Sequence, residues 1–179
     1  MSRKSGFTIV ELLAVVAILV VLLGLVGTAA AAAIRNAREK RADALVLAWK
    51  NAITSYYAQK GEWPTAIESA AKSKRDQIVK LNANEVNSVF QDVVNEALKK
   101  NNSLIDTSIL FVCLKKNAQG CDDVHKHCNC PSAMEFTKAL AMKKDVNGLA
   151  FGYPGVNKGK FRRFSISYNT QTDSISVSR

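Results

Sequence analysis

The most prominent pattern in the chain is an unbroken apolar run near its amino terminus. Between Leu12 and Ile34 the only polar side chain is that of Thr28. A helix over this run is about 34 Å long, which is enough to cross a bilayer core of roughly 30 Å. Arg3 and Lys4 precede the run, and cations of this kind are enriched on the cytoplasmic side of spanning helices. The pattern therefore predicts one membrane-spanning helix with a cytoplasmic amino terminus.

The helical pattern continues beyond the apolar run but becomes one-sided. Neither Pro nor Gly occurs between Thr28 and Lys60. Apolar side chains recur at helical spacing along one face, namely Leu45, Trp49, Ala52, Ile53 and Tyr56. Residues 34–59 are therefore predicted to form an amphipathic continuation of the same helix, with its apolar stripe covered by a folded domain. We expect the helix to end near Gly61, because glycine commonly terminates helices and Pro64 prevents continuation.

The rest of the chain mixes helical and strand patterns. Helices are expected at 66–81, 84–99 and 132–143, the last because Ser132 and Glu135 have capping-box spacing. The segment 108–114 is predicted to be a buried strand, and Asn147-Gly148 a turn. Alternating apolar residues predict a hairpin from residues 164–168 and 175–177, around a turn near 169–173. The predicted fold class is α+β: a long amino-terminal helix packed on a small antiparallel sheet, with inserted short helices.

Three kinds of protein begin with an apolar helix of this type. A cleaved secretory signal peptide has an apolar core followed by small residues, here Ala29–Ala33. A plain membrane anchor needs only the apolar run. An acid directly before the run, here Glu11, is unusual for a signal peptide, and a signal peptide needs no helical continuation. These two features argue against a signal peptide and favour a third kind of protein. The residues around Glu11 indicate which kind it is.

Those residues closely resemble a known processing signature. The stretch is Lys4-Ser5-Gly6-Phe7-Thr8-Ile9-Val10-Glu11-Leu12-Leu13. It resembles the prepilin signature of type IV pilins and of the pseudopilins of type II secretion. The resemblance implies that prepilin peptidase cuts after Gly6 and methylates Phe7, and that the mature protein keeps Glu11. In that family the acid pairs with the amino group of the first mature residue on a neighbouring subunit, which here is Phe7.

The resemblance also implies an organisation and a set of partners. Residues 1–6 are the leader, 7–33 the transmembrane and assembly half of the helix, and 34–179 the exported domain with the amphipathic half of the helix. The implied partners are further copies of the chain, other pilins or pseudopilins, prepilin peptidase and an inner-membrane assembly platform. The protein would start in the inner membrane and end in a periplasmic or cell-surface filament. The family commonly has a proline where this chain has Thr28, and this departure favours a pseudopilin.

Four cysteines follow the apolar run, in the part of the chain that is predicted to be exported: Cys113, Cys121, Cys128 and Cys130. Disulfides persist outside the cytoplasm, so we expect two structural bridges. A Cys128–Cys130 bridge would close a strained ring. This leaves Cys113–Cys128 with Cys121–Cys130, or Cys113–Cys130 with Cys121–Cys128.

Metal binding is the weaker interpretation of this region. Cysteines and histidines between 121 and 130 are zinc-ligand types, but their spacing matches no familiar zinc pattern. Asp145 and Asn147 suggest calcium, but the loop has too few carboxylates. The sequence therefore predicts no metal and no other cofactor.

The chain is basic, with a formal net charge of +10. Such a charge fits a solvated surface, or attraction to DNA or to an anionic cell surface. Basic residues interleave with aromatic ones near the carboxy terminus, at Lys158, Lys160, Phe161, Arg162, Arg163 and Phe164. This pattern fits single-strand binding, although a charged sheet edge is the more common interpretation.

No nucleophile–base arrangement stands out, so we do not expect an enzyme. The sequence predicts a structural filament subunit. The alternative is a membrane-anchored extracytoplasmic module that binds DNA or another ligand and forms no filament.

Overall fold

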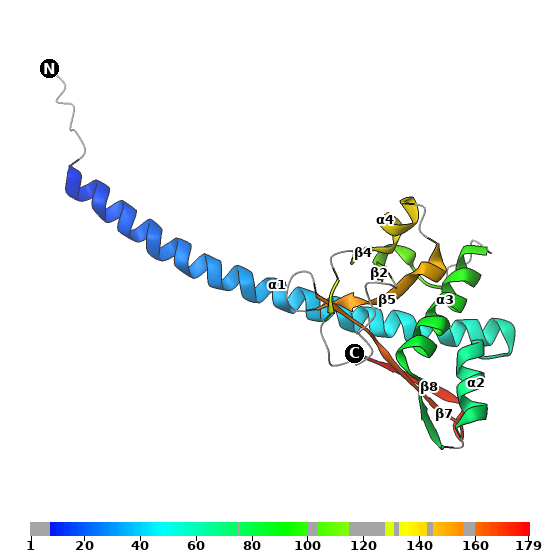
Figure 1. Ribbon diagram of the computed structural model, residues 1–179. Helices are drawn as coiled ribbons and strands as arrows, with labels where there is room; N and C mark the ends of the chain where they lie inside the picture. Colours follow the sequence, from blue (N-terminus) through cyan, green and yellow to red (C-terminus); the bar gives the residue numbers. More distant parts are fainter. Residues whose placement is uncertain are drawn as a thin grey trace. The chain divides into compact units, whose positions relative to one another are not determined.

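The structure is a computed structural model, which describes residues 8–74, 76–99, 104–114, 128–130, 133–142, 145–155 and 160–179. The chain divides into two compact units, Met1–Ala37 and Arg38–Arg179. The first unit contains the beginning of a long helix. The second contains the rest of that helix, two antiparallel sheets and the shorter helices (Figure 1). The predicted α+β class, with a long amino-terminal helix and an antiparallel sheet, is confirmed.

Helix α1 (Ile9–Lys60) ends where the sequence predicts. Gly61 follows it with a φ of +75°, a left-handed conformation that glycine adopts without the steric cost of a Cβ atom. The Gly61 N–H donates to the carbonyl oxygen of Tyr57 at 2.8 Å, which satisfies one of the last helical acceptors. Pro64 then precedes helix α2 (Thr65–Ser73).

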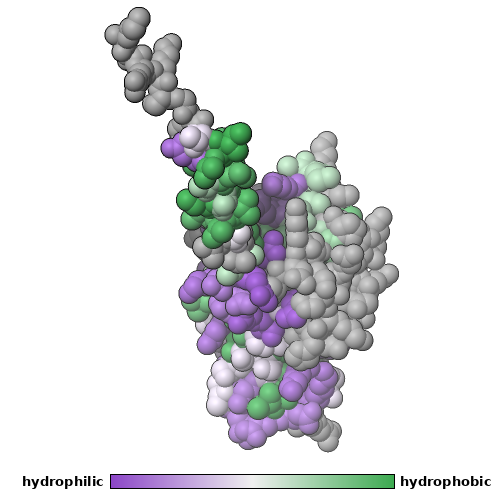
Figure 2. All heavy atoms as spheres, turned by 90° about the vertical axis from the view of Figure 1, so that its left-hand side faces the viewer, coloured by the Kyte–Doolittle hydropathy of each residue, from purple (hydrophilic) through white to green (hydrophobic). Residues whose placement is uncertain are grey.

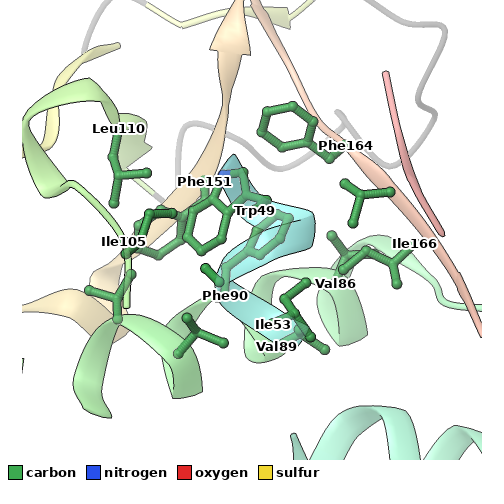
Figure 3. Packing of buried hydrophobic residues seen from close by; sticks show 14 of the residues in the cluster. Trp49, Ile53, Val86, Val89, Phe90, Ile105, Leu110, Phe151, Phe164 and Ile166 are labelled. Atoms are coloured by element: carbon green, nitrogen blue, oxygen red, sulfur yellow. The ribbon is translucent and has the colours of Figure 1, made fainter. Parts of the chain in front are cut away.

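The apolar stripe of α1 lies in the core of the second unit. Leu45, Trp49 and Ile53 are each at most 1% exposed. The Trp49 ring stacks on Phe90 with 4.0 Å between ring centroids, and it meets Phe151 edge-on at 5.5 Å (Figure 3). The predicted role of this stripe is therefore confirmed.

The predicted helix over residues 66–81 is wrong in its second half. Helix α2 ends at Ser73, and strand β1 (Ile78–Lys80) follows it. Val79 is fully buried and lies opposite Tyr168 in an antiparallel pair. Branched side chains such as those of Ile78 and Val79 pack well on a pleated surface, so a distant sheet partner overrides the local helical pattern.

Helix α3 (Ala83–Lys99) agrees with the predicted helix over 84–99. A capping box closes its first turn. The side-chain Oδ1 of Asn82 accepts the N–H groups of Asn84 and Glu85 at 3.0 and 2.9 Å. In return, Glu85 Oε2 accepts the N–H of Asn82 at 2.6 Å. These bonds explain why the helix begins at this point.

The strands form two sheets in which every pair is antiparallel. The first has the order β1-β7-β8, and its strands β7 (Ser165–Asn169) and β8 (Ser174–Ser178) form the predicted carboxy-terminal hairpin. The second has the order β3-β6-β5-β2-β4. Its strands, in chain order, are β2 (Phe111–Leu114), β3 (Cys128–Asn129), β4 (Met134–Glu135), β5 (Leu149–Pro154) and β6 (Lys160–Arg162).

Two turns refine the predictions around the second sheet. The predicted strand over 108–114 starts as a single 3-10 turn, η1 (Thr107–Ile109), and only its second half is β2. Asp106 caps η1 by accepting the N–H of Ser108 at 2.9 Å, which explains the later start of the strand. The predicted turn at Asn147-Gly148 is the 3-10 turn η3 (Val146–Gly148).

The predicted helix over 132–143 is shorter than expected. Helix α4 covers Phe136–Ala141, and Met134–Glu135 pair with β2 as strand β4. Glu135 is the residue before the helix and makes no side-chain capping bond. Its predicted capping partner, Ser132, lies outside the described residues. Pairing of β4 with β2 thus takes the place of the first helical turn that the capping pattern indicated.

Candidate functional site

The first part of α1 has a surface suited to a membrane. Within the described residues, α1 is the one helix long and apolar enough to span a bilayer. Its large side chains are exposed in the first unit, with Ile9 at 78%, Leu12 at 61% and Leu23 at 71%. Figure 2 shows a band of hydrophobic side chains on the visible face of this part of the helix, behind the polar residues at its start. A helix that is apolar all round needs lipid or neighbouring helices around it.

Glu11 and Thr8 cap the amino terminus of α1 with reciprocal hydrogen bonds. The carboxylate oxygen Oε2 accepts both the backbone N–H and the side-chain hydroxyl of Thr8, each at 2.8 Å. The Glu11 N–H donates back to Thr8 Oγ1 at 3.3 Å. This reciprocal arrangement is a capping box, in which Thr8 is the N-cap and Glu11 the third helical residue. It holds the carboxylate against the helix terminus, where the helix dipole also favours negative charge.

Comparison with known proteins identifies the segment that contains this box. Residues 1–27 match the family model described as the prokaryotic N-terminal methylation motif. The chain carries the type IV pilin and pseudopilin signature. Neither the curated proteins nor the solved structures yield a match to the chain. The signature and the apolar helix fit processing by prepilin peptidase and membrane anchoring, and they point to a structural role.

The predicted assembly residues are only partly described. Gly6 and Phe7 lie outside the described residues. Glu11 is described, and its Oε2 is engaged by Thr8 while its Oε1 has no hydrogen-bond partner among the described residues. The pairing of Glu11 with the Phe7 amine of a neighbour therefore stays a prediction. Sequence reasoning missed Thr8, although its spacing from Glu11 is that of a capping box.

One of the two expected disulfides is present in the described residues. Cys113 in β2 forms a disulfide with Cys130, 17 positions further along the chain. Both residues are buried, in a small cluster with Ala150 and Phe161. This bridge excludes the pairing Cys113–Cys128 and removes two thiols from any zinc site. Cys121 and the side chain of Cys128 lie outside the described residues, so their bridge stays a prediction.

The basic-aromatic segment is not a stacking surface for nucleic acid. Phe161 is fully buried and Phe164 is 1% exposed, so neither ring is available to stack on a base. Arg163 is 6% exposed and donates to the carbonyl oxygen of Ala83 at 3.2 Å. Lys158 and the side chain of Lys160 lie outside the described residues. The less favoured interpretation of this segment, a single-strand platform, therefore does not hold at Phe161 and Phe164, whose rings point into the protein.

Asp145, which suggested calcium, has a local structural role. Its carboxylate accepts the N–H of Asn147 at 3.3 Å and caps the 3-10 turn η3. Such a cap accounts for an acid and an amide at this spacing without a metal ion. Within the described residues, no group of three metal-ligating side chains comes together.

Three donors converge on a single carboxylate that sequence reasoning did not identify. Asp173, in the β7–β8 turn, accepts hydrogen bonds from Trp63 Nε1 at 2.6 Å, Tyr168 Oη at 2.7 Å and Tyr57 Oη at 2.9 Å. The aromatic rings of these donor residues also pack on one another. Tyr57 stacks on Trp63 with 4.2 Å between ring centroids, and Trp63 meets Tyr168 edge-on at 5.9 Å. We call these four residues the Asp173 cluster. It joins the exit of α1 to the carboxy-terminal hairpin.

The hydrogen bonds of the Asp173 cluster shift the pKa values of its members in opposite directions. Donation by Tyr168, Trp63 and Tyr57 lowers the pKa of Asp173. Burial and the bond to Asp173 raise the pKa of Tyr168 to about 12. The stabilisation from the carboxylate is therefore complete above its ordinary pKa and is lost as the pH falls through the lowered value. The contribution of Tyr168 is complete below its ordinary pKa and is lost as the pH rises towards about 12.

Proposed function

We propose that this chain is a structural subunit of a type IV pilus-like filament or a type II secretion pseudopilus. The match of residues 1–27 to the methylation motif is the observation that carries the proposal. In this account, prepilin peptidase cuts after Gly6, methylates Phe7 and leaves a mature chain anchored by the apolar part of α1. An assembly platform in the inner membrane then brings subunits together into a filament.

The continuity of α1 supports a filament subunit over a cleaved export signal. The helix runs without interruption from Ile9 to Lys60, so the apolar segment and the core stripe belong to one element. Removal of a signal peptide near Ala29–Ala33 would divide this helix. Exposed Leu and Val side chains on all sides of the first part suit a segment that exchanges lipid contacts for contacts with neighbouring helices.

Glu11 is the residue we expect to align an incoming subunit. An ionised carboxylate at the membrane is costly unless it is paired. The bonds from Thr8 compensate part of this cost within one subunit, and among the described residues Oε1 has no donor. The amine of Phe7 on a neighbour would bring positive charge to that oxygen. Because the partner is charged, the contact is stronger than a neutral hydrogen bond in surroundings of low dielectric.

Three features bear on the kind of filament. An aromatic, a glycine and a proline follow one another at the helix exit, here Tyr57, Gly61 and Pro64, and this order resembles the helix exit of many pseudopilins. This exit, together with Thr28 in place of a proline, favours a pseudopilus. The buried Cys113–Cys130 bridge in the carboxy-terminal half favours a pilus, because many pilins close that region with a disulfide. A membrane-anchored DNA-binding module loses its main support, since Phe161 and Phe164 are buried.

Processing is the first test of the proposal. Protein purified from the membrane of cells that contain prepilin peptidase should begin at Phe7 and carry one methyl group on its amine. Intact-mass measurement with amino-terminal peptide sequencing reads both changes. Cells without the peptidase supply the control and should retain residues 1–6. A mature terminus within Ala29–Ala33 would contradict the proposal and establish the signal peptide instead.

A further inference from the structure

The Asp173 cluster occupies a position where two segments far apart in the sequence could separate. Tyr57 and Trp63 flank the end of α1, whereas Asp173 and Tyr168 belong to the hairpin, 116 positions from Tyr57 in the case of Asp173. The side chains of Ala58, Gln59 and Lys60 are exposed, and Lys60 Nζ pairs with Glu96 Oε1 of α3 at 3.1 Å. Tyr57 and Trp63, by contrast, pack in or against the hydrophobic core. The hydrogen bonds that Tyr57 and Trp63 donate to Asp173, together with the ring contact of Trp63 with Tyr168, join the helix exit to the hairpin.

The backbone of Asp173 is specialised for this task. Its φ is +47°, the one left-handed non-glycine conformation among the described residues. Asp and Asn tolerate this region better than other residues with a side chain. The turn thereby directs the carboxylate to all three donors, and hydrogen bonds to a charged acceptor are roughly twice as strong as neutral ones.

A second contact joins the same helix to the same hairpin and provides a comparison. Asp43 of α1 pairs with Arg179, which follows β8, at 3.1 Å between Oδ1 and Nε. The two side chains are 59% and 45% exposed, so water competes for both charges. Ion pairs of this kind contribute little to stability. The Asp173 carboxylate is exposed as well, but it accepts three hydrogen bonds, one of them from the largely buried Trp63, whereas Asp43 makes an exposed ion pair.

We propose that Asp173 is a latch that keeps the exit of α1 on the carboxy-terminal hairpin. Its mechanical value rests on the proposed filament function: tension that enters the domain through α1 would separate the exit from the hairpin, and the latch opposes this separation. The latch itself is a property of the second unit and exists whether or not the chain assembles.

Hydrogen exchange on the full chain in detergent micelles tests the latch independently of assembly. Asp173→Asn keeps the side-chain shape and the tolerance for positive φ but removes the charge. We expect amide exchange at residues 57–63 and 168–174 to accelerate about tenfold or more, with no change in α3. Asp43→Asn makes the same chemical change at the exposed pair and should change exchange less than about threefold.

Two outcomes would overturn the latch. Equal protection in Asp173→Asn and in the unsubstituted chain would show that the carboxylate does not hold the exit. Uniform acceleration throughout residues 38–179 would show that the residue supports the whole domain rather than this junction.

A pulling experiment tests the mechanical role. The domain pulled between the start of α1 and Arg179 should unfold about tenfold faster at constant force in Asp173→Asn. If hydrogen exchange accelerates but the unfolding rate under force is unchanged, the latch stands and only its mechanical role is contradicted.

Discussion

Replacing Glu11 with alanine should abolish entry into filaments when the variant is the only copy in the cell. The variant should still be cut after Gly6, because cleavage depends mainly on the leader and the glycine. It should still insert into the membrane, because the apolar run is intact and the helix has lost a charge. What it loses is the carboxylate that we expect to pair with the Phe7 amine of a neighbour. Filament preparation and membrane fractionation measure the two outcomes separately.

Three further variants distinguish ionic pairing from capping. Glu11→Gln keeps the shape and removes the charge, so it should fail almost as completely if the pairing is ionic. Thr8→Ala removes a hydroxyl from the capping box but leaves the carboxylate, and it should assemble better than Glu11→Ala. Glu39→Ala removes an exposed acid from the same helix and should assemble normally. Normal filaments or normal secretion with Glu11→Ala would remove the assembly role and favour the anchored module.

Trp49→Ala should destabilise the domain by roughly 3–5 kcal/mol, the range for removing a large aromatic side chain from a core. Trp49 is 1% exposed and contacts Phe90 and Phe151, so its loss removes ring contacts and leaves a cavity (Figure 3). A loss of this size is a large part of the total stability of a typical domain. Urea unfolding of a fragment covering Arg38–Arg179, followed by circular dichroism, measures the change.

Leu47 provides the matched control on the same helix. Its side chain is 59% exposed, so Leu47→Ala should change the free energy of unfolding by less than about 0.5 kcal/mol. A small effect of Trp49→Ala beside a large effect of Leu47→Ala would reverse the assignment of the two helix faces. The stripe would then belong to an interface between subunits rather than to the core of its own domain.

Features with a strong local cause could be predicted from the sequence. The stripe of α1 recurs at helical spacing over several turns, and Leu45, Trp49 and Ile53 are buried as expected. The helix exit at Gly61 depends on the conformational freedom of glycine, and the φ of +75° confirms it. The carboxy-terminal hairpin alternates with a period of two, which no helix can satisfy.

Capping patterns show where local reasoning needs the rest of the fold. Thr8 and Glu11 have the same spacing as Ser132 and Glu135, and the first pair forms a capping box. In the second pair, Ser132 lies outside the described residues and Glu135 makes no side-chain capping bond to the helix that follows it. At Glu135 the backbone pairs with β2 as strand β4, and the helix starts after it. The segment 78–81 behaves in the same way, because pairing with β7 outweighs its helical pattern. In both places a partner distant in sequence decides the structure.

The Asp173 cluster could not be predicted, because its members share no sequence signal. An aspartate in a hairpin turn is common, and nothing local indicates that Tyr57 and Trp63 reach it. The disulfide illustrates the same limit. The spacing of the cysteines left two sets of disulfides open. In the fold, Cys113 in β2 lies beside Cys130, the residue after β3, and these two cysteines form the bridge.

Photocrosslinking from the apolar face of α1 is the most direct measurement of the central claim. A photoactivatable residue in place of Val16, which is 49% exposed, should crosslink the chain to another pilin-like subunit in cells that contain the assembly machinery. We expect this product to require both the peptidase and Glu11. Crosslinks to lipid alone, unchanged by loss of the peptidase or of Glu11, would show that the helix only anchors the chain and would contradict the account.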